Sequence, residues 1–317
     1  MPTVNDIRST LDMLHNRYRP LNTGAVATYI PELAKADPDL FCIAVRFVDG
    51  TGFTIGDTDA RFTLQSCSKP LILAQALETV GRDIIVRLTG VEPTGNSFSS
   101  IVGLDQIGKP LNPMVNAGAI VTASLLPGNT PEDRFERMRQ NLGRCLNADP
   151  QIDEPVYESE LRTGDRNRAI AYLLKSQGVI EGDVMHHLDL YIRQCAISTN
   201  TTHLANAAAT LANNGINPIT NQQAIAPEYI KDILVVMLMN GMYNYAGRWA
   251  YEVGIPAKSG VSGAIMGVVP GVMGIAVYSP RLDEYGNSTR GLAVFRELSE
   301  RHNLHILDQR TADDPNQ

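Results

Sequence analysis

The chain has 317 residues, of which 44% are hydrophobic and 19% are charged, so it is long enough for one large globular domain or two smaller ones. Its 27 basic and 34 acidic residues give a formal net charge of −7 without a basic stripe, which argues against a nucleic-acid partner. Because no apolar run approaches the length of a membrane span and residues 1–20 carry charge throughout, we expect a cytoplasmic protein without a signal peptide.

The sequence predicts neither a disulfide framework nor a metal site. The four cysteines are far apart and form no Cys-x-x-Cys pair. His186 and His187 are adjacent rather than four positions apart, so they do not share a helix face as metal ligands would. We therefore expect reduced thiols and two surface histidines.

The N-terminal residues predict a helix followed by a β-hairpin. Thr3 with Asp6 is typical of a helix N-cap, and apolar residues then recur at helical spacing, so we expect an amphipathic helix packed on a sheet. Two strands are predicted at 41–48 and 52–57. Between the helix and the strands, Tyr29 is either a core aromatic or a side chain that points into a site, and the local pattern favours the core.

A Ser-x-x-Lys pair follows the hairpin. If a helix begins near Ser66, then Ser66 and Lys69 lie on one face, with the hydroxyl and the amine close enough to exchange a proton. Pro70 is tolerated mainly in a first turn, which places Ser66 at the helix mouth, where unpaired N–H groups favour an oxyanion. Because both residue types are common, roughly one such pair occurs by chance in a chain of this length, and a solvated helix start is the alternative.

Helical patterns dominate the next part of the chain. Asn116 lies in a small-residue segment at 112–120 and is either a structural clamp or a ligand contact. Residues 130–142 carry strong helix-start signals. The polar segment 159–167 reads as a loop that feeds a helix, which is either a ligand site or a solvated turn. Further helices are predicted at 169–175, 188–195, 202–214 and 227–239, the last of them deeply buried.

Strands return near the C-terminus. The runs 264–269 and 272–278 flank a Pro-Gly turn and predict a hairpin, after which Asn287 or Ser288 caps a last helix. Residues 311–317 are expected to be a frayed tail.

Strands near both ends with helices between them predict an α+β fold. Because isolated hairpins are marginally stable, the two ends should pair into one mainly antiparallel sheet, with a large helical insertion. We expect a sheet-and-helix subdomain of residues 1–65 plus 250–317 and a helical subdomain of residues 66–249. A cleft should form where the two meet, and both Ser66 and Lys258 fall on this seam.

These motifs resemble those of a known enzyme class. Ser66 and Lys69, followed far downstream by Lys258-Ser259-Gly260, resemble the motifs of serine β-lactamases and penicillin-binding proteins, although the Ser-Asp-Asn motif of those enzymes is absent. The chain is more similar to the serine-dependent glutaminase family, which shares the β-lactamase/DD-peptidase-like fold. This resemblance runs from Tyr29 to about Gly291 and is carried by residues 65–70, 112–119, 159–160, 164–167, 241–243 and 256–261.

The resemblance implies hydrolysis of L-glutamine to L-glutamate and ammonia through an acyl-enzyme. Ser66 would be the nucleophile, and either Lys69 or Tyr243 would be the general base, a choice that the sequence leaves open. To act as a base, Lys69 must lose its proton near neutral pH, which requires burial or a positive neighbour such as Lys258. The backbone N–H groups of Ser66 and Val261 would form the oxyanion hole.

The resemblance also implies how a free amino acid is held. Glu160 would pair with the α-ammonium group of glutamine. The α-carboxylate would be bound by Asn116, Asn167, Tyr191 and Tyr29, while Lys258, Ser259 and Gly260 would support the site. The family further implies no metal or organic cofactor, and a homodimer or homotetramer. A β-lactamase or peptidase, and a catalytically inactive small-molecule sensor on the same scaffold, are the rival interpretations.

Overall fold

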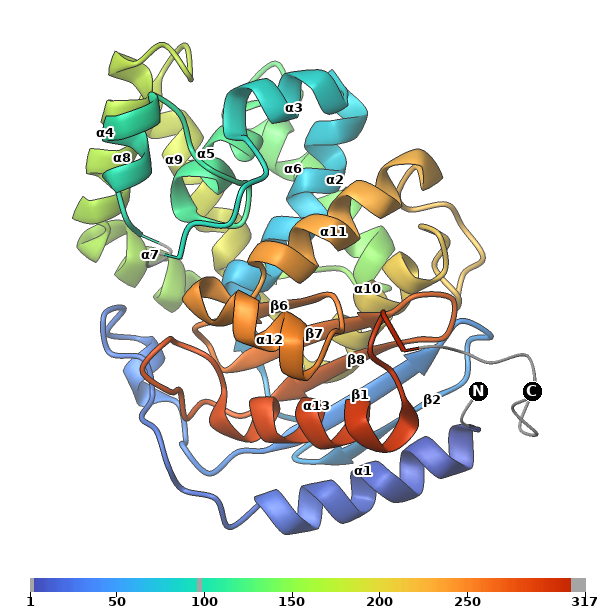
Figure 1. Cartoon of the computed structure of the whole chain (residues 1–317). Helices are drawn as coiled ribbons and strands as arrows, with labels where there is room; N and C mark the ends of the chain where they lie inside the picture. The colour runs from blue at the N-terminus through green and yellow to red at the C-terminus, as the bar shows by residue number, and fades with distance from the viewer. Residues whose placement is uncertain (1–2, 96–98, 309–317) are drawn as a thin grey trace.

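Strands from both ends of the chain form the central sheet. The computed structural model describes residues 3–95 and 99–308, and its main sheet has the order β2-β1-β8-β7-β6 with antiparallel neighbours (Figure 1). The strands are β1 (Cys42–Phe47), β2 (Gly52–Gly56), β6 (Ala257–Gly260), β7 (Ala264–Val269) and β8 (Met273–Tyr278). The predicted α+β architecture, with one antiparallel sheet built from both ends, is confirmed.

Two terminal helices cover one face of this sheet. They are α1 (Val4–Tyr18) and α13 (Thr289–His302) (Figure 1). Thr3 caps α1 by accepting a hydrogen bond from the Asp6 N–H, and Ile7, Leu11 and Leu14 are fully buried against the sheet. Burial of that apolar stripe explains why the first helix packs where its periodicity predicts.

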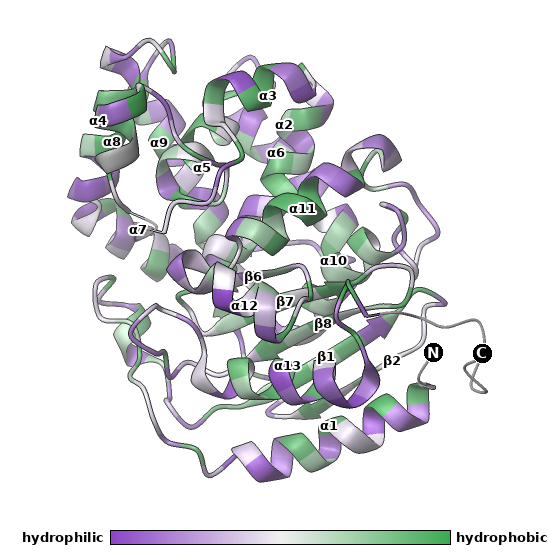
Figure 2. Ribbon diagram, in the orientation of Figure 1, coloured by the Kyte–Doolittle hydropathy of each residue, from purple (hydrophilic) through white to green (hydrophobic). Residues whose placement is uncertain are grey.

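A helix from the middle of the chain covers the other face. Helix α10 (Thr201–Ala212) packs on β1, β7 and β8. The approach is close because β8 has a glycine at the contact: a Cβ atom on Gly274 would lie 2.1 Å from the Ala209 nitrogen. Figure 2 shows that the central strands, on which α10 packs, are largely hydrophobic.

Further helices complete the fold, most of them on the α10 side of the sheet (Figure 1). They are α2 (Lys69–Val80), α3 (Arg82–Thr89), α4 (Val102–Ile107), α5 (Asn116–Ser124), α6 (Pro131–Leu146), α7 (Glu154–Thr163), α8 (Asp165–Ser176), α9 (Val184–Cys195), α11 (Ile230–Asn240) and α12 (Ala246–Glu252). Helix α12 packs its Trp249 against Phe295 of α13. The 3₁₀ turns in the described ranges are η1 (Leu33–Lys35), η2 (Gln65–Ser68), η3 (Pro227–Tyr229) and η4 (Tyr243–Tyr245). A second sheet of order β3-β5-β4 joins β3 (Phe62–Thr63), β5 (Ile197–Thr199) and β4 (Gln151–Ile152).

The polar segment predicted as a loop at 159–167 is helical instead. Helices α7 and α8 are separated only by Gly164. Helix α7 begins at a cap that the prediction missed, because the Asp153 side chain accepts from the Val156 N–H at 3.1 Å and Pro155 lies in the first turn. Its residue Glu160 is therefore buried rather than solvated.

Two further expectations about burial are wrong. Helix α11 is buried on one side only, since Ile233 is fully buried whereas Val235 is 48% exposed. His187 is not a surface residue, because its ring packs inside and Nε2 lies 2.7 Å from the Glu181 carbonyl oxygen.

The expected frayed tail at 311–317 lies outside the described residues. Within the described ranges, no helix combines the length and the apolar character needed to cross a membrane.

Candidate active site

Ser66 lies in a tight turn between a strand and a helix. Strand β3 ends at Thr63, η2 follows, and α2 begins at Lys69. Gln65 has a left-handed backbone with φ of 46°, a strained conformation that is frequent at functional sites. Pro70 occupies the first turn of α2, as predicted, so Ser66 stands at the mouth of the helix with 7% of its surface exposed.

Lys69 is buried beneath this turn. Its amine donates to Asn116 Oδ1 at 2.7 Å and to the Met114 carbonyl at 3.3 Å. Asn116, in the first turn of α5, donates in turn to Asn167 Oδ1 at 3.0 Å. Burial lowers the pKa of Lys69 to about 8, while the nearby Glu160 carboxylate raises it. Burial, and not a neighbouring Lys258, is therefore the main reason that this amine can be neutral near physiological pH.

Glu160 is a buried carboxylate with little protein compensation. It is 5% exposed and accepts one long hydrogen bond of 3.5 Å, from Gln65 Nε2. Burial raises the pKa of Glu160 to about 7, against the lowering effects of Gln65 and Lys69. A carboxylate that is removed from water in this way favours a cationic ligand.

Tyr243 hydrogen-bonds the Ser66 hydroxyl. Its own hydroxyl donates to the Ser259 carbonyl at 2.8 Å, so the Ser66 hydroxyl is the donor in their hydrogen bond. Burial raises the pKa of Tyr243. Like Gln65, Tyr243 has a left-handed backbone, with φ of 58°. The tyrosine therefore serves as a neutral hydrogen-bond partner of the serine.

Strand β6 packs directly on the Ser66 turn. The Cys67 thiol donates to the Lys258 carbonyl at 3.4 Å, and a Cβ atom on Gly260 would lie 3.1 Å from both Cys67 Sγ and the Leu64 carbonyl oxygen. The structure thus brings together the two segments that the sequence places on one seam, near the start of α2 in Figure 1. Cys67 is fully buried in this contact.

Lys258 lies behind Tyr243. Its amine donates to the Gly241 carbonyl at 2.9 Å and the Ser259 carbonyl at 2.7 Å, and it lies 4.2 Å from the centroid of the Tyr243 ring. Burial first, and then the charge of Lys69, hold the pKa of Lys258 well below its usual range. These contacts fix the tyrosine and the end of β6.

Two backbone donors are free at this seam. Among residues 3–95 and 99–308, the N–H groups of Ser66 and Val261 have no protein acceptor. Val261 follows β6 in a turn, where its side chain packs with Tyr243 and Leu282. Unpaired N–H groups next to a buried hydroxyl are able to bind an anionic oxygen.

Two tyrosines complete the surroundings of Glu160. Tyr191 on α9 is 2% exposed and hydrogen-bonds Cys195, and its pKa is raised by burial and then by Cys195 and Glu160. Tyr29 is 53% exposed, so the prediction of a core aromatic is wrong. Its hydroxyl is nevertheless desolvated, and burial followed by the nearby Glu160 raises its pKa. Tyr29 thus presents its hydroxyl to the site and leaves much of its ring in solvent.

The comparisons with known proteins agree on one family. Residues 24–307 match the family model described as Glutaminase. The chain is 52% identical to a glutaminase of Nostoc sp. (strain PCC 7120) over 93% of this chain and 88% of the relative, and 46% identical to a glutaminase of Clostridium tetani over 90% and 94%. The chain belongs to the glutaminase family. The rival interpretation as a β-lactamase or peptidase has no support in these matches.

Solved structures superpose on nearly the whole chain. A probable glutaminase named ybaS has 40% identity and a TM-score of 0.94, covering 97% of this chain and all of that one. A probable glutaminase from Bacillus subtilis, complexed with 6-diazo-5-oxo-L-norleucine, has 36% identity and a TM-score of 0.87, covering 96% and 98%. A third structure, Mglu in its glutamate form, has 37% identity and a TM-score of 0.91, covering 98% of this chain and 72% of that chain.

Sequence reasoning did not single out Gln65 or Cys195 in this glutaminase-family site. Gln65 touches Glu160, and Cys195 touches Tyr191. The position of Gln65, directly before the Ser66 motif, was a usable signal, whereas Cys195 carries none. In the described part of the chain, no group of three or more His, Cys, Asp or Glu side chains is arranged to hold a metal ion.

Proposed function

We propose that the chain, which is a glutaminase that hydrolyses L-glutamine to L-glutamate and ammonia, acts through an acyl-enzyme on Ser66. The observation that carries this proposal is the meeting of a helix-mouth serine, a buried lysine and a buried carboxylate in one site of a glutaminase-family chain. The Ser66 oxygen would attack the side-chain amide carbon, ammonia would leave, and water would then release glutamate.

Lys69 is the proposed general base. A group whose pKa is about 8 is partly neutral at physiological pH, whereas a tyrosine whose pKa is raised stays protonated and is a poor proton acceptor. Tyr243 would orient the Ser66 hydroxyl and relay the proton that Lys69 takes from Ser66 to the departing nitrogen, so that ammonia leaves, Lys69 is neutral again and Tyr243 stays protonated. We therefore assign the role of general base to Lys69 and not to Tyr243.

The tetrahedral intermediate would be bound by the free N–H groups of Ser66 and Val261. Loss of one such donor costs roughly 3–4 kcal/mol in enzymes of this mechanism, a term comparable to general-base catalysis. Lys258, Ser259 and Gly260 would set the position of Val261, because they form the strand that precedes it.

The free ends of the substrate have matching partners. Glu160 would bind the α-ammonium group, which relieves the cost of its own burial. The amides of Asn116 and Asn167 and the hydroxyls of Tyr191 and Tyr29 would bind the α-carboxylate. Relatives described in a glutamate form and in complex with 6-diazo-5-oxo-L-norleucine support an amino-acid ligand in this family.

Architecture and assembly are proposed on the same footing. The chain would have the serine β-lactamase/DD-peptidase-like fold, with residues 1–65 plus 250–317 as one subdomain and residues 66–249 as the other. It would act in the cytoplasm as a homodimer or homotetramer, without a metal or organic cofactor, and light scattering coupled to size-exclusion chromatography would measure the assembly.

The mechanism is tested by Ser66→Ala. We expect this substitution to lower kcat for ammonia release from glutamine by about 10³-fold or more, with the circular dichroism spectrum unchanged. A coupled ammonia assay on glutamine and asparagine, run beside a chromogenic β-lactam, separates the glutaminase from its rivals. Turnover of glutamine at the wild-type rate by Ser66→Ala would remove the serine from the mechanism.

A further inference from the structure

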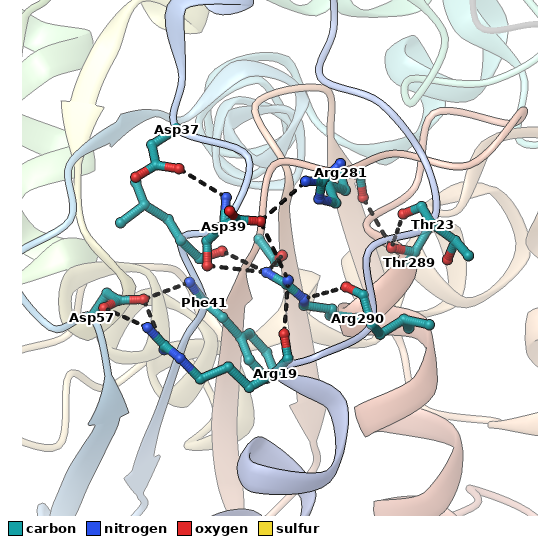
Figure 3. Close-up of polar contacts among 12 residues, drawn as sticks. Arg19, Thr23, Asp37, Asp39, Phe41, Asp57, Arg281, Thr289 and Arg290 are labelled. Atoms are coloured by element: carbon teal, nitrogen blue, oxygen red, sulfur yellow. Dashed lines mark hydrogen bonds and ion pairs between the residues drawn. The ribbon is translucent and has the colours of Figure 1, made fainter.

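A buried arginine near the C-terminus hydrogen-bonds both ends of a segment in the N-terminal region. Arg290, in the first turn of α13, is 2% exposed and lies among main-chain carbonyl groups (Figure 3). Its Nε donates to the Leu21 carbonyl at 2.8 Å, and Nη2 donates to the Arg19 carbonyl at 2.9 Å. Its Nη1 donates to the carbonyls of Asp39 at 3.2 Å and Leu40 at 3.4 Å.

These carbonyls flank residues 22–38, which we call the bridge segment. Arg290 therefore holds its two ends at one point, as the planar five-donor guanidinium is suited to do. Neighbouring contacts hold the same two ends of the bridge segment. Thr289 Oγ1 donates to the Thr23 carbonyl at 3.0 Å, and Arg281 donates to the Asp39 carboxylate at 3.0 Å (Figure 3).

The far end of the bridge segment reaches the candidate active site. The Glu32 N–H donates to Ser159 Oγ at 3.3 Å, next to Glu160 on α7. Ala27 and Leu33 pack against the cluster that contains Tyr243 and Val261. Tyr29 lies between these contacts in the chain, and its hydroxyl is within electrostatic reach of Glu160, the residue that follows Ser159. The bridge segment is thus anchored to α13 at its two ends and to α7 near its middle, through Glu32.

We propose that Arg290 is a positioning residue for substrate binding, which fixes the bridge segment so that Tyr29 stands beside Glu160. The inference rests on the proposed function of Tyr29 and deepens it. Arg290 touches no reacting atom, so its effect is on substrate affinity and is transmitted through Tyr29.

The test is a double-mutant cycle between Arg290→Lys and Tyr29→Phe. Lysine keeps the charge and the aliphatic stem but lacks the five-donor fork. We expect Arg290→Lys to raise KM for glutamine about tenfold with kcat within about twofold. The reason is that the proposed hydrogen bond from the Tyr29 hydroxyl to the α-carboxylate of glutamine is weakened. In the Tyr29→Phe background, Arg290→Lys should add little to KM. Arg301→Gln, an exposed ion-pair residue on the same helix, is the matched control and should leave KM unchanged.

Hydrogen–deuterium exchange supplies a readout that does not depend on catalysis. Arg290→Lys should accelerate amide exchange in the bridge segment and leave exchange in α10 unchanged. If Arg290→Lys fails to fold, Thr289→Val is the milder variant, because it removes only the hydrogen bond from Thr289 Oγ1 to the Thr23 carbonyl. It should raise KM and amide exchange in the same direction.

The failures are distinguishable. Ammonia release by the wild-type chain with additive KM effects of the two substitutions, or with unchanged exchange, would overturn the role of Arg290 alone. Absence of ammonia release by the wild-type chain would overturn the proposed function and this role with it.

Discussion

Lys69 and Glu160 are two ionisable residues that the fold removes from water in one site. The pKa of Lys69 is lowered to about 8 and that of Glu160 is raised to about 7, and burial is the largest cause of both shifts. Each group also favours the charged form of the other, which limits both shifts. Both residues therefore change charge within the pH range in which the enzyme would be assayed.

We predict that kcat/KM for glutamine rises with pH between about 6 and 9. A base must be neutral, so Lys69 contributes less as pH falls below about 8, and an ammonium ligand needs an ionised carboxylate, so Glu160 binds less as pH falls below about 7. Both effects have the same sign. Initial rates over this range, fitted separately for kcat and KM, measure them.

The variant Glu160→Gln separates the two contributions. Its KM should be raised and should no longer fall as pH rises through about 7, while the dependence of kcat on Lys69 remains. A wild-type kcat/KM that is constant between pH 6 and 9 would contradict the assignment of both residues.

At the residue scale, spacing alone predicted the helix-mouth position of Ser66, because Pro70 restricts where the helix can start. The partners of the substrate were assigned only by resemblance, since Glu160 and Asn116 are distant in sequence and come together through tertiary packing. Tyr29 was misjudged because an aromatic in an apolar stretch reads as core, and nothing local shows that the bridge segment crosses a site.

At the scale of elements, the contact between β6 and the Ser66 turn depends on a glycine. We predict that Gly260→Ala destabilises the protein by about 1–3 kcal/mol, because its Cβ would lie 3.1 Å from the Leu64 oxygen and Cys67 Sγ, which must move. Since that movement displaces the proposed oxyanion donors, kcat should fall about tenfold or more while KM changes less.

Gly247→Ala is the matched control for this prediction. A Cβ atom there meets nothing within 4 Å, and the residue lies in α12. Alanine in a helix should leave stability unchanged or raise it by about 0.4–1 kcal/mol. Thermal denaturation and glutamine kinetics of both variants measure the difference, and equal kcat in Gly260→Ala and Gly247→Ala would refute the role assigned to the contact.

Local start signals were a sufficient guide for α6 but not for α12. Thr130 and Pro131 begin α6 as predicted, since the Thr130 side chain accepts from the Asp133 N–H at 3.1 Å. Helix α12 escaped prediction because its residues 246–252 are mixed in character and no side chain caps it. The small sheet β3-β5-β4 is unpredictable locally, because its strands have only two or three residues and pair with segments that are distant in sequence.

At the scale of the molecule, the antiparallel sheet was predictable because hairpin signals lie near both ends, whereas the packing of α10 on it was not. That helix belongs to the middle of the chain and forms part of the core against β1 and β8. The two proposed subdomains therefore share a core and should not unfold independently.

We predict a single cooperative unfolding transition. The one tryptophan, Trp249, is the last residue of the proposed helical subdomain, but it is fully buried beside Phe295 of α13 and so reports on the sheet layer, while far-UV circular dichroism reports mainly on the helices. The two signals should give the same midpoint in urea. Midpoints that differ beyond experimental error would show that the subdomains are separately stable.

The burial of every cysteine has a practical consequence. All four thiols are free and buried, and burial raises the pKa of Cys42 to about 11 and those of Cys67 and Cys145 to about 12. Maleimide reagents, which react with accessible thiolates, should leave the native protein unlabelled. A cysteine introduced at Tyr251, which is 87% exposed, would therefore carry a fluorophore at one defined position without prior removal of the native thiols.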